Sequence, residues 1–380
     1  MTASSSGRHQ DVRWRPAGRH RVTGRLRHLG DDRVVGKGMV AYDDGVPAPL
    51  HALFQQRVDG DDALLRLAQL RFEQFGLTAE TYGGSAGELD HVLAFVPSGV
   101  RRPIVHLPRH IDLLREADRA AVAVIVRQFG DRMSGFVVHD RLEMPARLCD
   151  FQAAATQLSR ALVEAGPAQL FVEYAAGCQV AEFVAMGAAL EGIPQVGLCI
   201  DTGHVGIRES RRAFARIRPE INFDLAQLSP TDPRLPDLVD DVQSAVAAGL
   251  PAVLTLTAAL VEQRTPTHYH LHDGHPLIPR LSDHFGFQNR LAIPFTYHGV
   301  RSLDPLYGVA GLAAILAATQ AFEPERVSLT LEIHQVDARL PLGDAAGLFA
   351  HWRDLTNAER MNAWLAVLTQ HSVLVSALRR

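Results

Sequence analysis

Two hydrophobic periods alternate along the chain. From about residue 60 onward, amphipathic stretches with the 3.6-residue period of a helix are separated by short apolar runs that end in polar residues. The runs predict eight strands, at residues 34–42, 77–82, 103–106, 135–139, 170–173, 196–201, 268–272 and 328–332. The amphipathic stretches predict helices at 61–75, 117–129, 151–165, 179–190, 209–217, 235–248, 308–321 and 345–354. Repeated βα units indicate an α/β fold with a parallel sheet.

The ends of the predicted strands favour a closed (β/α)₈ TIM barrel over an open, doubly wound sheet. The last six strands each end in His, Glu or Asp, and a barrel places its catalytic groups at the C-terminal ends of its strands. No Gly-x-Gly-x-x-Gly follows the first strand, so a dinucleotide site has no support. We predict one barrel domain over residues 34–380, with long loops within 206–267 and 274–325 on its C-terminal face.

Composition limits the function classes. The chain has 380 residues, 47% of them hydrophobic and 21% charged, as in globular proteins. Lys37 is the only lysine, which makes a Schiff-base aldolase a poor fit. Residues 1–33 carry eight arginines against three aspartates, a local charge of +5, and the overall charge of −4 leaves −9 for the rest. We predict a flexible, Arg-rich N-terminal arm over residues 1–33, and a body that lacks the cationic surplus for phosphate backbones.

Cysteine usage and hydropathy bear on location. The three cysteines are far apart and form neither a disulfide framework nor a Cys-x-x-Cys metal motif. No run reaches the roughly 18 uninterrupted apolar residues of a membrane helix, and no secretory h-region begins the chain. We therefore expect a protein of the cytoplasm with no membrane partner, and the sequence leaves a homo-oligomer open.

Two segments concentrate ionisable residues at strand ends. The run 196–204, VGLCIDTGH, is an apolar strand that delivers Asp201 at its tip and His204 three residues later. The run 268–275, HYHLHDGH, contains four histidines, and the period of two places His268, His270 and His272 on one side of the strand. Asp201 alone could simply cap the next helix, whereas an Asp and a His in this order also suit a metal site.

Two further strands, 170–173 and 329–332, are apolar and close on Glu173 and Glu332. Each glutamate alone could be an ion-pair partner, but a buried carboxylate needs compensation, and a shared divalent cation supplies it. Oxygen-rich ligands with imidazole and no sulfur suit one or more ions of Mn²⁺, Zn²⁺, Fe²⁺, Co²⁺ or Mg²⁺. His106 and His139 also fall at strand tips, where they can be ligands, substrate contacts or ordinary loop residues.

Between His106 and Glu332 the sequence resembles the xylose isomerase-like barrel superfamily, which includes sugar isomerases and epimerases and the endonuclease IV group (AP endonuclease family 2). The resemblance rests on strand-end residues in order, namely His106, His139, Glu173, Asp201-Thr202-Gly203-His204, His270-Leu271-His272-Asp273 and Glu332. In the epimerase-like branch it implies that Glu173, Asp201, His270 and Glu332 hold one metal. In the endonuclease-like branch it implies further zinc ligands at His106, His139, His204 and His284, although Asp283 and His284 are adjacent where that branch separates them by one residue.

Three enzymatic functions follow as expectations. The first is a metal-dependent isomerase, epimerase or related lyase acting on a small polyhydroxylated carbonyl compound such as a sugar or cyclitol, with Glu173, Glu332 and His204 as catalytic residues. The second is a zinc phosphodiesterase on abasic DNA, which the charge of the body disfavours. The third is an iron-dependent oxidase on the same barrel. A non-enzymatic binding protein is the weakest interpretation, because it would have no use for this ligand set.

Overall fold

The computed structural model describes residues 50–54, most of 66–94, 102–228, 232–277, 293–296, 303–333 and 357–379. All of them belong to one compact unit, Gly45–Arg380. The predicted N-terminal arm, residues 1–33, lies outside the described residues, as does the predicted strand at 34–42.

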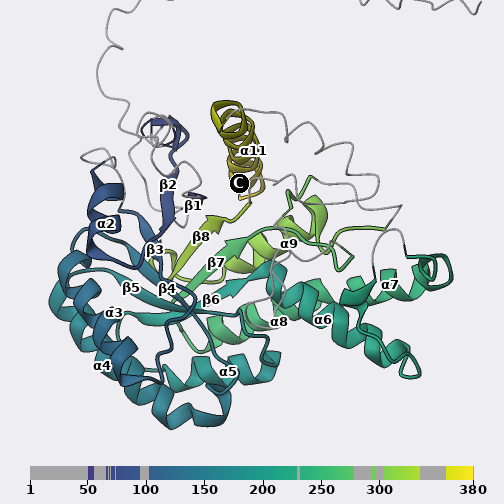
Figure 1. Cartoon of the computed structure of the whole chain (residues 1–380), viewed down its shortest axis with the longest axis horizontal. Coiled ribbons are helices and arrows are strands. Elements are labelled where there is room, and N and C mark those ends of the chain that lie inside the picture. The colour runs from purple at the N-terminus through teal and green to yellow at the C-terminus, as the bar shows by residue number, and fades with distance from the viewer. Residues whose placement is uncertain are drawn as a thin grey trace, which may run out of the picture. The chain divides into compact units, whose positions relative to one another are not determined.

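Eight parallel strands close into a barrel in sequence order, and β8 pairs with β1 (Figure 1). The strands are β1 (Leu50–Phe54), β2 (Thr78–Tyr82), β3 (Ile104–His106), β4 (Gly135–His139), β5 (Gln169–Glu173), β6 (Val196–Asp201), β7 (Thr267–Leu271) and β8 (Val327–Leu331). The predicted α/β barrel is confirmed, and seven of the eight predicted strands lie within one residue of their observed bounds. The prediction for the first strand was wrong, because Leu50–Phe54 occupies the place between β8 and β2.

Helices connect most of the strands and pack on the outside of the barrel (Figure 1). They are α2 (Ala86–Leu93), α3 (Glu116–Phe129), α4 (Leu148–Ala165), α5 (Val180–Ala189), α6 (Thr202–Ile217), α7 (Val239–Val246), α8 (Gly249–Glu262), α9 (Gly308–Thr319) and, after the barrel, α11 (Asn357–Leu378). Helix α6 begins seven residues before the prediction, directly at the end of β6. The predicted helix at 235–248 is a 3₁₀ turn (Leu235–Leu238) followed by α7.

The barrel interior is apolar on one side and polar on the other. Ile104, Val137, Phe171 and Cys199, from β3 to β6, form a buried apolar cluster. Across from it, Glu80 of β2, His268 of β7 and Thr330 of β8 are fully buried and hydrogen-bonded to one another. A buried polar network is stable only when its members are satisfied, and the mutual hydrogen bonds of Glu80, His268 and Thr330 meet this condition.

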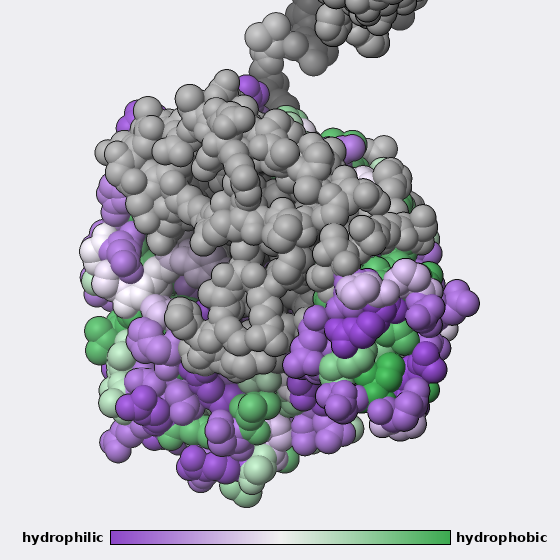
Figure 2. All heavy atoms as spheres, turned by 45° about the vertical axis from the view of Figure 1, so that its right-hand side comes forward, coloured by the Kyte–Doolittle hydropathy of each residue, from purple (hydrophilic) through white to green (hydrophobic). Residues whose placement is uncertain are grey.

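One described stretch, Leu235–Glu262, is long and apolar enough to cross a membrane by length and composition, with a mean hydropathy of 1.9 over its most apolar window. It includes α7 and α8, which pack against α6, while α8 also packs against α9. On the face in Figure 2, the described surface is largely hydrophilic, and the hydrophobic residues form small separate groups. The core helix of a soluble protein can meet the same criterion, so this stretch is weak evidence for a membrane.

Candidate metal centre

Four strands bring their C-terminal residues to one point inside the barrel. Glu173 ends β5, Asp201 ends β6, His270 lies one residue before the end of β7, and Glu332 follows β8. The strand register places Asp201 directly beside His270. Each of the four residues offers a ligand atom, all of these atoms lie within 4.8 Å of one another, and the residues are buried. We call this set the donor group.

His270 Nδ1 is at the centre of the donor group. It lies 3.1 Å from Glu332 Oε2, 3.5 Å from Glu173 Oε1 and 4.0 Å from Asp201 Oδ2. Among the described residues, neither His270 Nδ1 nor Asp201 Oδ2 has a hydrogen-bond partner, although both are buried. Leaving buried polar atoms without a hydrogen bond is costly, and a cation placed between these two atoms would compensate both. The set of one imidazole and three carboxylates therefore fits a divalent metal ion.

The negative charge around His270 also favours a bound cation in the donor group. Burial lowers the pKa of His270, but Cys199, Glu80, Glu332 and Glu173 raise it well above its ordinary value. A proton on His270 is thus favoured because negative charge surrounds the ring. A divalent ion bound between these residues would compensate the same negative charge. His270 would then be neutral, with Nδ1 as the ligand atom.

The two carboxylate oxygens of Asp201 make different contacts. Oδ1 accepts a hydrogen bond of 2.7 Å from the backbone N–H of His204, which makes Asp201 the N-cap of α6, and it lies 3.0 Å from His272 Nε2. Oδ2 faces His270 and lies 3.6 Å from His204 Nε2. The capping bond and the His272 contact fix the carboxylate, so Oδ2 is held toward the donor group. Contact with Asp201 raises the pKa of His272 to about 9, although burial alone would lower it.

Two histidines hold the second oxygen of Glu173. His106 Nε2 lies 2.8 Å and His139 Nε2 3.1 Å from Glu173 Oε2. Burial raises the pKa of Glu173, but His139, His270 and His106 together bring it well below its usual range. Glu173 is therefore ionised, with Oε1 left toward His270. His106, Glu173 and His270 form a second, overlapping set of possible ligands.

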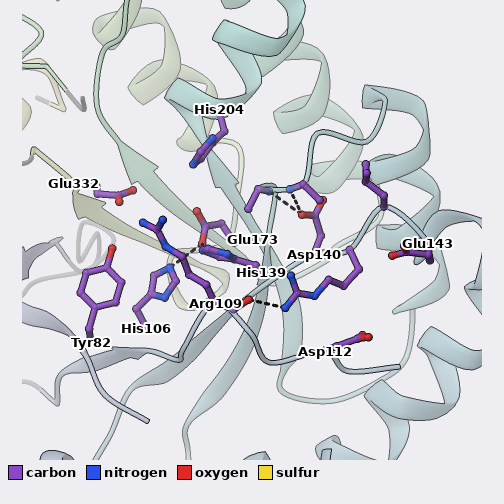
Figure 3. A pocket seen from close by; sticks show the side chains of 14 residues that line it. Tyr82, His106, Arg109, Asp112, His139, Asp140, Glu143, Glu173, His204 and Glu332 are labelled. Carbon is purple, nitrogen blue, oxygen red and sulfur yellow. Dashed lines mark hydrogen bonds and ion pairs between the residues drawn. The ribbon is translucent and has the colours of Figure 1, made fainter. Parts of the chain in front are cut away.

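A cavity of about 340 Å³ opens above the donor group (Figure 3). Glu173 and Glu332 lie on its wall together with His106, His139 and His204. The remaining lining residues are Tyr82, Arg109, Asp112, Asp140, Arg141, Leu142, Glu143, Ala175 and Ala176. Polar and ionisable side chains thus predominate around a space of the size that a small metabolite needs.

The structure brings together seven of the eight residues that the sequence singled out as metal ligands. His284 lies outside the described residues, as does Asp283. Asp273, which the resemblance places in the strand-seven motif, accepts hydrogen bonds from the backbone N–H groups of Gly274, Tyr307 and Gly308. Its described contacts therefore fix the start of α9, away from the donor group.

Sequence reasoning missed Glu80. This fully buried carboxylate of β2 accepts a hydrogen bond of 2.9 Å from His270 Nε2, and its other oxygen lies 3.1 Å from His268 Nε2. His268 Nδ1 in turn lies 2.7 Å from Ser328 Oγ. Because Glu80 occupies Nε2 of His270, it fixes the ring orientation in which Nδ1 points to the donor group. The sequence feature that could have indicated Glu80 is its position two residues before Tyr82, which places both side chains on the same face of the predicted strand.

Comparison with known proteins adds little beyond the fold. No protein-family model and no curated protein matches the sequence. A structural match is the carboxyl transferase domain of Rhizobium etli pyruvate carboxylase, solved with pyruvate and biocytin, at 12% sequence identity and a TM-score of 0.40. The match covers 87% of this chain but only 48% of that one, so the chain spans about half the length of its structural neighbour. The xylose isomerase-like resemblance therefore remains a prediction.

Proposed function

We propose that this protein is a divalent-metal-dependent enzyme that moves a proton beside a carbonyl group of a small polar substrate, as an isomerase, epimerase or related lyase. The observation that carries the proposal is the donor group, in which ligand atoms of two glutamates, an aspartate and a histidine lie within 4.8 Å of one another, and whose two glutamates line the cavity. When bound there, a divalent ion would polarise substrate oxygens and stabilise developing negative charge.

The two glutamates suit different tasks. Glu173 is held in its ionised form by His106 and His139, which fits a fixed ligand and makes it a weak base. Glu332 is at the cavity wall beside His270 Nδ1, so it can reach both a ligand position and a substrate carbon. We assign the proton transfer to Glu332. His204, on the first turn of α6 and one-fifth exposed, is placed to contact a substrate oxygen.

The test is deuterium exchange on the metal-loaded protein. Full-length protein is reconstituted separately with Mn²⁺, Co²⁺, Zn²⁺, Fe²⁺ and Mg²⁺ and incubated in D₂O with ketoses, cyclitols and small hydroxy-carbonyl compounds. We expect deuterium at a carbon next to a carbonyl in at least one combination, and none with Glu332→Gln. Bound metal with no exchange or conversion across the panel would refute the proton-transfer assignment.

One observation favours a second candidate, a multi-zinc phosphodiesterase. His106, His139 and His204 line the same cavity as the donor group and could hold further ions. Against this, His106 and His139 both contact Glu173 Oε2, and residues 34–380 carry a net charge of −9, which opposes duplex binding. Cleavage of an abasic duplex by the zinc form would select this candidate, and oxygen consumption by the iron form would select the oxidase.

A further inference from the structure

Two arginines line the cavity above the donor group, and they differ in what they contact. The guanidinium of Arg141 donates hydrogen bonds to the backbone carbonyls of Arg109 and Ile111. The guanidinium of Arg109 is partly exposed in the cavity, near Glu173 and Glu332 (Figure 3). Within the part of the chain that the structure describes, it has no ion pair, although Asp112, Asp140 and Glu143 line the same cavity. The N–H groups of the Arg109 guanidinium are therefore available to bind a ligand.

The backbone that carries Arg109 is fixed in advance. Arg141 Nη2 lies 2.5 Å from the carbonyl oxygen of Arg109 and 2.7 Å from that of Ile111. A turn is closed by the N–H of Ile111 donating to the carbonyl of Pro108 at 3.0 Å, and Asp112 Oδ1 accepts from Leu114 N at 2.9 Å. Because these bonds hold the loop after β3, a ligand that uses Arg109 does not have to order its backbone.

The net charge of the donor group explains what the guanidinium of Arg109 would contribute to ligand binding. Three ionised carboxylates and a neutral imidazole around one divalent ion leave a net charge of −1, so the donor group would repel an anionic ligand. Arg109 lines the same cavity as Tyr82 and the two glutamates of the donor group, Glu173 and Glu332. Arg109 thus supplies the attraction that an anion needs at this position.

We propose that Arg109 binds an anionic group of the substrate, a carboxylate or a phosphomonoester, while the other end of the substrate reaches the donor group. The location of the reacting end rests on the proposed function. A planar guanidinium binds both kinds of anion through paired hydrogen bonds, and the cavity of about 340 Å³ limits the ligand to a compact molecule. The substrate class is accordingly a small hydroxy or oxo acid, or the phosphate ester of a small sugar.

The test compares three probes of one carbon skeleton on full-length protein loaded with Mn²⁺: glycerol, glycerate and glycerol 3-phosphate. We expect calorimetry to show at least one anion binding about tenfold or more tightly than glycerol, and the tighter anion identifies the group. Arg109→Gln should weaken that anion about tenfold to a hundredfold, as expected for a lost hydrogen bond to a charged group. It should leave glycerol binding unchanged. Arg160→Gln, on the exposed face of α4, is the matched control and should behave as the wild type.

Two results would overturn the inference: equal affinity for all three probes, or an Arg109→Gln variant that binds the anions as the wild type does. The Mn²⁺ content of the same samples separates this inference from the proposed function. Bound Mn²⁺ with no preference for an anion contradicts the inference alone. An anion preference that depends on Arg109 in protein that takes up no metal contradicts the proposed function and supports the anion site.

Discussion

Replacing Glu80 by glutamine tests whether a buried residue outside the donor group controls the metal site. Glu80 uses one oxygen for His270 Nε2, at 2.9 Å, and the other for His268 Nε2 and the hydroxyl of Thr330. Glutamine keeps the volume and one acceptor oxygen for His270, and its NH₂ group would face His268. His268 can accept from it if its own proton moves to Nδ1, which faces Ser328 Oγ at 2.7 Å. The fold should therefore survive.

The magnitude follows from the charge that is lost. A hydrogen bond to a carboxylate is roughly twice as strong as a neutral one, and loss of the group that orients a metal-binding histidine typically costs about 10- to 100-fold in metal affinity. Because glutamine keeps one acceptor, we expect about a tenfold rise in the Kd for Mn²⁺ or Zn²⁺, equivalent to about 1.4 kcal/mol. The unfolding free energy of the metal-free protein should fall by no more than about 1–2 kcal/mol.

The assay is a chelator competition titration on full-length Glu80→Gln, with chemical denaturation in excess chelator as the measure of folding. Glu164→Gln, on the exposed face of α4, is the matched control and should match the wild type in both. A folded Glu80→Gln protein that binds metal with wild-type affinity would refute the argument that Glu80 positions His270. A variant with the expected Kd change but wild-type unfolding would show that the effect is confined to the site.

Three further predictions concern the chemistry, a close contact and the N-terminus. Glu332→Gln should lower kcat on the identified substrate on the order of a hundredfold or more while the protein stays folded, because an amide cannot accept the proton; Glu173→Gln should lose a comparable amount, and near-normal turnover in both would make these glutamates structural. Gly203→Ala would place a methyl group against the ring of His272, so metal affinity should fall at least about tenfold by the loss of the His272 contact to Asp201, and an unchanged Kd would contradict that role. Removal of residues 1–33 should leave metal binding and turnover intact; a truncated protein that fails to fold would show that these residues belong to the barrel.

The barrel was predictable because its signal is local and repeated. Apolar runs such as 196–201 carry both the strand period and the polar end that marks the C-terminal edge of a barrel. Element starts were less certain where helix and strand meet without a loop. Helix α6 begins at Thr202 directly after its N-cap Asp201, and its first two turns contain Gly203 and Gly206 and are mostly buried, so they lack the exposed charged face of the stretch that begins at residue 209. The first strand, Leu50–Phe54, is no shorter than most of the others, but it ends in a phenylalanine and lacks the terminal His, Glu or Asp that marked the last six predicted strands.

The site was predictable in part for the same reason. Glu173, Asp201 and Glu332 each end an apolar run, so their convergence follows from the barrel itself. Glu80 was missed because it lies inside its strand, and its partners His268 and His270 are 188 and 190 residues away. The local sequence pattern also could not show that His106 and His139 both contact the same oxygen of Glu173. Contacts of this kind depend on the closure of the barrel, which single-sequence patterns do not encode.

The central claim is that Glu173, Asp201, His270 and Glu332 together hold a divalent ion. The most direct measurement is an anomalous difference map from crystals of the full-length protein grown with Mn²⁺ or Zn²⁺, recorded at the absorption edge of the metal. We predict a peak at about 2.0–2.2 Å from oxygen atoms of the three carboxylates and from Nδ1 of His270. A map with no peak between these four side chains, from protein that is folded and exposed to saturating metal, would contradict the account.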